Sequence, residues 1–167
     1  MPARDIIIIA HNLRSIHNVG SILRTADGLG IKEIYLTGYS PYPKTPDDSR
    51  LPHISNKLTA QLHKTALGAE TADNIIYNED IMTVLATLKT RGYQIIAVEQ
   101  TVNSVALPEY APSEHIALVV GREVEGIEKT VLDQCDYAIE IPMIGRKESF
   151  NVSVAAAIAL YHCRFAP

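Results

Sequence analysis

The chain has 167 residues, of which 47% are hydrophobic and 20% charged, and this balance excludes a disordered chain, a collagen and a coiled coil. The length fits a single domain, which we place at residues 1–167. The net charge of −4 argues against a uniformly basic nucleic-acid binder, yet residues 1–64 hold eight Lys or Arg against five Asp or Glu, enough for a local basic face.

Short apolar runs rich in Ile and Val alternate along the chain with segments of helical pattern. In chain order we expect strand Ile6–Ala10, helix Asn18–Leu29, strand Glu33–Leu36, helix Leu58–Leu67, strand Ile75–Tyr77, helix Asp80–Thr90, strands Tyr93–Val98 and Ile116–Val120, helix Glu128–Cys135, strand Ala138–Ile141 and helix Val152–Cys163. Asn18 is the predicted N-cap of the first helix and Gly30 its stop. The alternation predicts an α/β domain, and the continuous apolar strands predict a parallel sheet covered on both faces.

Residues 38–53 form the only long segment without a regular pattern. Its prolines exclude regular structure, and it carries Lys44, Arg50 and His53. Cys135 and Cys163 form no zinc motif, so we expect no metal and two packed thiols in a reducing cytoplasm. No apolar stretch reaches the roughly 18 residues that a membrane span needs.

Two segments carry polar residues at positions where ligands often bind, one at the start of a predicted helix and one directly after a predicted strand. In residues 18–24, Asn18 and Arg24 lie near the first two turns of a helix, where they either reach into a site or serve as a cap and an exposed charge. Residues 121–126, Gly-Arg-Glu-Val-Glu-Gly, follow a buried strand and form either a ligand loop with one buried carboxylate or a plain turn.

A third segment, residues 141–151, joins the last strand to the last helix. It is either a cofactor loop or a plain connection in which Ser149 or Asn151 caps the helix. No Gly-x-Gly-x-x-Gly run follows the first strand, so a cofactor would be held by the C-terminal half of the chain.

In this order, the three segments resemble the motifs of the SpoU (TrmH-type) family of RNA 2′-O-ribose methyltransferases, within the SPOUT superfamily. Asn18, Gly20 and Arg24 match the family's Asn-x-Gly-x-x-x-Arg motif. Its Gly-x-Glu-x-x-Gly motif is matched by Gly121, Glu123 and Gly126. Its Ile-Pro-Met…Ser-Leu-Asn-Val-Ser motif is matched by residues 141–153, with Phe150 in the usual Leu place. The resemblance covers about the whole chain.

The resemblance implies a SPOUT fold, an α/β domain whose C-terminal segment forms a trefoil knot. It also implies that S-adenosylmethionine binds in that knot, largely on backbone groups. By carry-over, the cofactor-binding residues are Val98, Glu99, Gly121, Ile141, Met143, Ser149 and Phe150.

The same resemblance implies the catalytic residues. The family proposal makes the Arg at the Arg24 position the activator of the 2′-hydroxyl, either as a base or as an electrostatic stabiliser. Because a guanidinium is effectively always charged, stabilising the developing alkoxide and gripping the adjacent phosphate fit it better. Asn18 would hold Arg24 or the ribose, and Glu123 would orient donors by accepting hydrogen bonds. Ser149 and Asn151 would close the site at the start of the last helix. The chemistry requires no metal.

The resemblance further implies a homodimer that acts on tRNA or rRNA. Many relatives carry extra terminal helices, so we expect a bare catalytic domain with modest RNA affinity of its own. The residues we expect to face RNA are Arg14, Arg24, Lys44, Arg50 and Lys57.

Three other functions compete with this prediction. A dimeric RNA-binding or assembly factor would keep the fold but catalyse no reaction. Loss of Arg24, Glu123 or Asn151 would favour it, and all three residues are present. A knotted methyltransferase acting on a base nitrogen would not need the pair Asn18 and Arg24. A generic metabolic α/β enzyme would show a nucleophile elbow or a phosphate loop.

Overall fold

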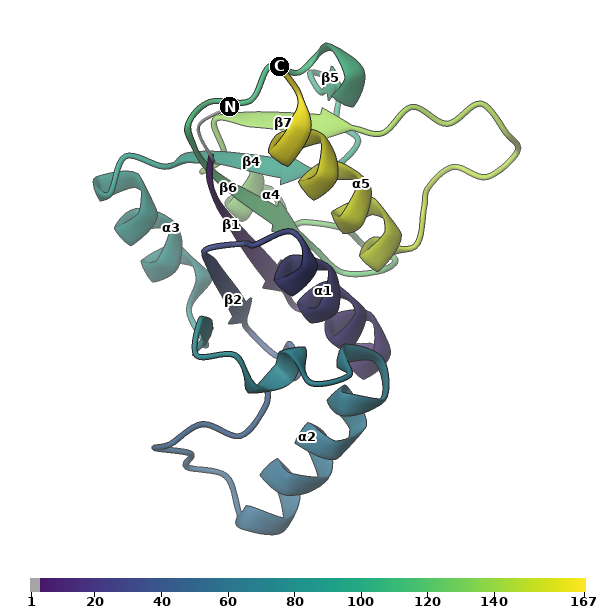
Figure 1. Ribbon diagram of the computed structural model, residues 1–167. Helices are drawn as coiled ribbons and strands as arrows, with labels where there is room; N and C mark the ends of the chain where they lie inside the picture. Colours follow the sequence, from purple (N-terminus) through teal and green to yellow (C-terminus); the bar gives the residue numbers. More distant parts are fainter. Residues whose placement is uncertain (1–3) are drawn as a thin grey trace.

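The computed structural model describes residues 4–167, which form one seven-stranded sheet flanked by helices (Figure 1). The strand order is β3-β2-β1-β6-β4-β7-β5, and all neighbouring strands run parallel. The strands are β1 Asp5–His11, β2 Glu33–Thr37, β3 Ile75–Asn78, β4 Gln94–Val98, β5 Val105–Ala106, β6 His115–Val120 and β7 Tyr137–Glu140. The helices are α1 Ile16–Gly28, α2 Pro52–Ala66, α3 Ile81–Thr90, α4 Lys129–Leu132 and α5 Val152–Phe165. The predicted parallel α/β sheet is confirmed.

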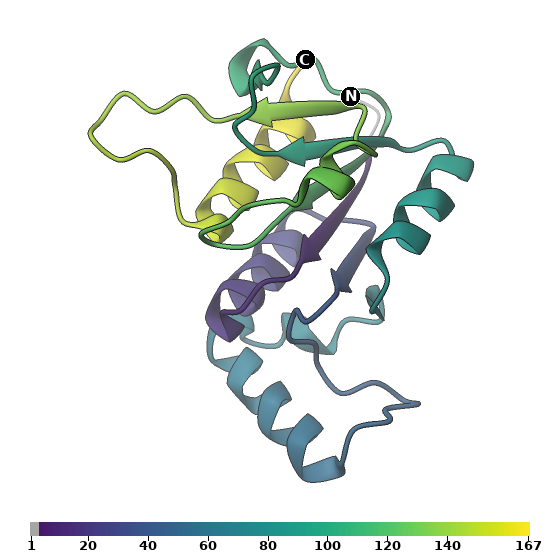
Figure 2. The ribbon, with the colours of Figure 1, turned by 180° about the vertical axis from the view of Figure 1, so that it is seen from behind.

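Helices cover both faces of the sheet, because successive residues of a strand point to opposite faces. In β1, Ile6 and Ile8 share a buried cluster with residues of α1, α2 and α5. Ile7 and Ile9 lie in a second buried cluster with residues of α3 and α4. Figure 2 shows α3 and α4 on the face opposite α1 and α5. Burial on both sides explains the unbroken isoleucine run.

The first predicted helix starts earlier than its pattern indicated. α1 begins at Ile16, and its N-cap is Ser15, whose side chain accepts a hydrogen bond from the backbone N–H of Asn18 at 3.2 Å. The prediction of Asn18 as the cap was therefore wrong. Its amide lies inside the first turn and is available for other contacts.

Other boundaries also differ from the predicted ones. α2 begins at Pro52, six residues before the expected start, because proline fits the first turn of a helix, where a backbone N–H has no partner. The helix expected over Glu128–Cys135 is shorter in the structure, where α4 covers only Lys129–Leu132. β5 was not predicted, since two residues show no periodicity.

The helix α2 packs on α1, at a point where α1 has no side chain. A Cβ atom added to Gly20 would lie 2.1 Å from Thr65 Oγ1 and 2.7 Å from the carbonyl oxygen of Leu62. Gly20 therefore permits the close approach of the two helices. Beyond this contact α2 extends away from the sheet (Figures 1 and 2).

The parallel strands bring their carboxyl ends to one edge of the sheet. The segments that follow β1, β4, β6 and β7 therefore meet there, although they are far apart in sequence. The connection from β7 to α5 makes a wide excursion before it returns to the first turn of α5 (Figure 1). Within residues 4–167, no helix combines the length and the apolar character needed to cross a membrane.

Candidate active site

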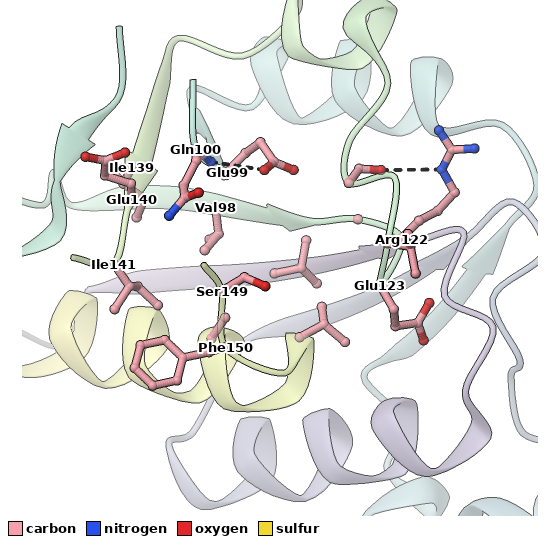
Figure 3. Close-up of a pocket in the computed structure, with 16 residues that line it drawn as sticks. Val98, Glu99, Gln100, Arg122, Glu123, Ile139, Glu140, Ile141, Ser149 and Phe150 are labelled. Atoms are coloured by element: carbon pink, nitrogen blue, oxygen red, sulfur yellow. Dashed lines mark hydrogen bonds between the residues drawn. The ribbon is translucent and has the colours of Figure 1, made fainter. Parts of the chain in front are cut away.

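A pocket lies at the carboxyl ends of β4, β6 and β7 (Figure 3). One side of it is closed by Phe150, which precedes α5, and by Val152 and Ala155 of the first turn of α5. Its other apolar walls come from the strand ends, and carboxylates from three different segments also line it. These carboxylates belong to Glu99, Glu123 and Glu140. The pocket therefore offers an apolar slot with hydrogen-bond acceptors at its rim.

Most of the predicted cofactor residues line this pocket. They are Val98, Glu99, Gly121, Ile141, Ser149 and Phe150. Met143 is the exception: it lies further along the connection from β7 to α5 and is not among the lining residues. Gln100, Arg122 and Glu140 also line the pocket and were not predicted.

The loop after β6 turns back sharply on itself, and both of its glycines are needed for the turn. A Cβ atom on Gly121 would lie 2.6 Å from Ile127 Cγ1. Gly126 has φ +70°, and a Cβ atom there would lie 2.3 Å from the carboxylate of Glu99. That carboxylate accepts hydrogen bonds from the backbone N–H groups of Ile127 and Gln100, each at 3.0 Å. Glu99 thus holds the loop at the pocket wall.

The carboxylate of Glu123 ties this loop to the turn between β1 and α1. It accepts hydrogen bonds from the backbone N–H groups of Arg14 at 3.2 Å and Ser15 at 3.0 Å, and from Asn18 Nδ2 at 3.2 Å. Burial alone would raise the pKa of Glu123, but the hydrogen bonds outweigh it and lower the pKa. Glu123 therefore accepts three hydrogen bonds at the pocket, and its predicted role in catalysis stays a prediction.

Asn18 continues the network to α5. Asn151 Nδ2 donates to Asn18 Oδ1 at 3.2 Å. Asn151 is also the N-cap of α5, since its Oδ1 accepts from the backbone N–H of Ser153 at 2.9 Å. The chain Glu123–Asn18–Asn151 joins the three segments that the sequence singled out. Asn18 makes no hydrogen bond with Arg24 within residues 4–167, so its amide holds the loop and α5 instead.

Arg24 and Ser149 are both exposed, and their side chains make no hydrogen bond within residues 4–167. Arg24 lies six residues after Asn18 on α1, and Ser149 lies at the pocket beside Phe150. The Arg24 guanidinium also makes no ion pair in that part of the chain. It is a cation on α1, the helix that carries Asn18, and it is available to a bound anion.

The four other residues that were predicted to face RNA fall into two groups. Arg14, Lys44 and Lys57 are exposed, although Arg14 pairs with Glu125 at 3.0 Å. Arg50 instead has its guanidinium bound to Asp48 and stacked 3.6 Å over the ring of Tyr42. The placement of Arg50 on an open face was wrong, because its donors are consumed in holding the loop before α2.

A buried polar cluster beside the pocket was not anticipated. His11, 6% exposed, approaches Thr37 Oγ1 with its Nδ1 at 2.8 Å, and its Nε2 lies 3.3 Å from Glu128 Oε2. Asn12, which has φ +53°, donates to Glu128 Oε1 at 3.0 Å. Burial lowers the pKa of His11, against the raising effect of Glu128. The His-Asn pair after a buried strand was the available signal, but nothing in the sequence points to Glu128 as its partner.

These contacts define what the site can do chemically. The network fixes the relative positions of an apolar pocket, the start of α5 and a helix that carries a free guanidinium. An arrangement of this kind can hold one reactant in the pocket and bind a charged group of a second reactant beside it. In residues 4–167, no group of three His, Cys, Asp or Glu side chains is placed to hold a metal ion.

Comparison with known proteins relates this geometry to described enzymes. Residues 5–161 match the model of the SpoU rRNA Methylase family. A tRNA (guanosine(18)-2′-O)-methyltransferase of Aquifex aeolicus is 32% identical over 161 residues, which cover 96% of this chain and 69% of that protein. The chain spans only 56% of the length of putative TrmH family tRNA/rRNA methyltransferases from staphylococci, at 31–32% identity.

Solved structures that resemble this chain also come from SpoU and TrmH proteins. The crystal structure of the A. aeolicus TrmH/SpoU tRNA modifying enzyme aligns with a TM-score of 0.77 at 28% identity, over 96% of this chain and 74% of that one. The SpoU methyltransferase AviRb from Streptomyces viridochromogenes, in complex with S-adenosylmethionine, aligns with a TM-score of 0.79 over 98% of this chain and 58% of that one. Its identity is 18%, so this second likeness concerns the fold alone.

Proposed function

The chain belongs to the SpoU rRNA Methylase family, and on that basis we propose that it transfers a methyl group from S-adenosylmethionine to a ribose 2′-hydroxyl of tRNA or rRNA. The observation that carries the proposal is the hydrogen-bonded chain Glu123–Asn18–Asn151, which joins the three family motifs at the mouth of one pocket. A base-nitrogen methyltransferase would not need the pair Asn18 and Arg24.

The pocket suits S-adenosylmethionine. Apolar side chains of Val98, Ile141 and Phe150 can cover the adenine, and the carboxylate of Glu99 and backbone groups of the strand ends can accept its hydrogen bonds. When bound, the cofactor supplies an electrophilic methyl group on a sulfonium. Gly121 also lines the pocket, and the space that its side chain would take is filled by Ile127 and Gly126 of the same loop.

The chain's own residues then position and activate the RNA hydroxyl. Arg24 binds the adjacent phosphate and stabilises the negative charge that develops on the 2′-oxygen, whose proton would pass to solvent. Asn18, Glu123 and Asn151 keep α1 and α5 in register with the pocket, so that the hydroxyl lies in line with the methyl group. Ser149, at the pocket, donates a hydrogen bond to the bound reactants.

The proposal includes a homodimer of one catalytic domain, residues 1–167, with a trefoil knot in the C-terminal segment. Family membership supports the knot and the dimer. An exposed apolar face on α5 also favours a dimer: Val154, Tyr161 and Phe165 are 43%, 62% and 54% exposed. A second copy would remove this face from water. The protein would act in the cytoplasm, where the free thiols of Cys135 and Cys163 persist.

Methyl transfer with an Arg24 variant tests the proposal. Label from S-adenosylmethionine should enter tRNA or rRNA, and Arg24→Ala should lower the rate at least about a hundredfold, the loss typical of one electrostatic stabiliser. Calorimetry should show the same cofactor affinity for both proteins, since Arg24 does not line the pocket. Absence of label with the wild-type protein in both RNA pools would contradict the proposal. Equal loss of cofactor binding in the variant would give Arg24 a structural role.

A further inference from the structure

The helix α2 is fixed to α1 beside the active-site network. Thr65 Oγ1 donates to the backbone carbonyl of His17 at 3.0 Å, one residue before Asn18. Leu62 and Ala66 are buried in the core, and Gly20 lets the two helices touch. A ligand held by α2 would therefore sit at a set position relative to Asn18 and Arg24.

The outer face of α2 is cationic. The helix holds two lysines and two histidines and no acidic residue, although the whole chain is acidic. His53, Lys57 and Lys64 are exposed and lie on one stripe, because spacings of four and seven residues return to the same side of a helix. Neither lysine forms an ion pair or a side-chain hydrogen bond within residues 4–167. Their charges are free to attract an anionic partner.

A groove runs beside this stripe, between α2 and the loop that precedes it. It is lined by Lys44, Asn56, Thr59, Ala60, His63 and Glu70. Its only carboxylate belongs to Glu70, whose side chain is 4% exposed and is bound by His63 and by the backbone N–H of Gly68. The charge of the Glu70 carboxylate is therefore bound by groups of the protein itself. The ammonium group of Lys44 and the amide of Asn56 remain exposed at the surface.

The wall that carries Lys44 is held in place before any ligand arrives. The backbone N–H of Lys44 donates to Thr59 Oγ1 on α2 at 2.8 Å. Arg50 stacks on Tyr42, whose ring is itself stacked on Tyr77 at 3.7 Å between centroids. Arg50 also donates to the carbonyl oxygens of Tyr42 and Pro43. A fixed wall lowers the ordering cost of binding.

From these observations we propose that α2 and its preceding loop bind the phosphates of the RNA strand that flanks the methylated nucleotide. The docking surface consists of Lys44, His53, Lys57 and Lys64. The inference rests on the proposed function, since RNA is the anionic partner expected beside Arg24. It adds a second contact region on this chain's own body, outside the three family motifs. Such contacts give affinity without reading the base sequence.

Charge reversal on α2 tests this docking surface. In the double variant Lys57→Glu/Lys64→Glu, the KM for RNA should rise at least about tenfold, whereas kcat and the calorimetric affinity for S-adenosylmethionine stay within about threefold of wild type. The logarithm of the RNA association constant falls linearly with the logarithm of the salt concentration, and the steepness of this line should decrease by about one to two units in the variant. Each phosphate contact in a single strand contributes roughly 0.7 to the steepness. Lys57→Gln/Lys64→Gln should show the same trend with a smaller effect.

A control for charge reversal elsewhere is Lys129→Glu on α4, an exposed lysine on the opposite face of the sheet that pairs with Asp133. It should change the KM for RNA and the salt slope little. If the α2 variants and the control shift these quantities equally, the docking surface is wrong.

Direct RNA binding, measured by fluorescence anisotropy with tRNA and rRNA fragments, separates this proposal from the proposed function. If the wild-type protein binds RNA through α2 but transfers no methyl group, the docking surface stands and the activity fails. Wild-type protein that binds neither RNA would overturn the docking surface directly.

Discussion

At the scale of single residues, Glu123 connects the pocket to the turn between β1 and α1 and to Asn18. One carboxylate accepts hydrogen bonds from two backbone N–H groups of the β1–α1 turn and from Asn18, and the same residue lies on the pocket wall. A carboxylate is suited to this because it offers only acceptors, and several donors can share it. Removal of its charge should loosen the turn and the pocket together.

The lowered pKa of Glu123 gives a pH signature. Because folding lowers this pKa, the carboxylate stabilises the fold above the unfolded-state pKa of about 4.3, and the stabilisation is lost as pH falls through the folded value. Glu123→Gln should lower the free energy of unfolding by about 1 kcal/mol at pH 7, since the site is partly open to solvent. Urea denaturation at several pH values should show the deficit shrink below pH 4. Glu125→Gln, in the same loop, is the control, and a deficit independent of pH would contradict this role.

The sequence could predict these residues only in part. Asn18, Glu123 and Asn151 stood out because polar residues followed apolar strands or opened helices, and their order matched family motifs. Their contact with one another could not be derived, since 105 residues separate Asn18 from Glu123. The partnership of His11 with Glu128 was missed for the same reason. Arg50 was misplaced because a charged residue in a proline-rich loop gives no sign of an internal partner such as Asp48.

At the scale of elements, the strands were predicted well and the connections poorly. The buried run Ile6–Ala10 needs no long-range information, because a short apolar run of β-branched isoleucines is typical of a strand covered on both faces. The start of α2 was missed because Pro52 was grouped with the preceding prolines, although a proline also suits a helix start. The position of α2 depends on a glycine in another helix, which no local pattern reveals.

Two glycines of α1 give a matched test of the packing of α2. Gly20→Ala should destabilise the protein by about 1–3 kcal/mol, because the added methyl group would overlap Thr65 and the backbone of Leu62. Gly28→Ala should instead raise stability by about 0.4–1 kcal/mol, since nothing lies within 4 Å of its added Cβ atom. Urea denaturation measures both. If the two variants behaved alike, Gly20 would not be the contact that admits α2.

At the scale of the whole molecule, charge and exposed aromatic surface lie on different helices. The basic excess of residues 1–64 includes the lysines of α2, whereas α5 presents exposed aromatic side chains. Tyr161 and Phe165 lie 4.7 Å apart between ring centroids and form a continuous apolar patch. One region is thus suited to an anionic partner and the other to a second copy of the chain.

The oligomeric state tests this division. Light scattering at micromolar concentration should give about twice 18.3 kDa for the wild-type protein. Tyr161→Ser/Phe165→Ser should shift the mass toward the monomer, because the substitution removes apolar area from the exposed face of α5. Met82→Ser on α3, an exposed residue on the opposite face, should leave the mass unchanged. A wild-type monomer would contradict the dimer.

The central claim is that the methyl group goes to a ribose oxygen, and the chemical position of the label tests it most directly. RNA labelled by the wild-type protein should be digested with alkali, which cleaves only next to a free 2′-hydroxyl. We expect the label in alkali-resistant dinucleotides, and we expect its loss when Arg24→Ala replaces the wild-type protein. Label recovered in mononucleotides would place the methyl group on a base and contradict the account.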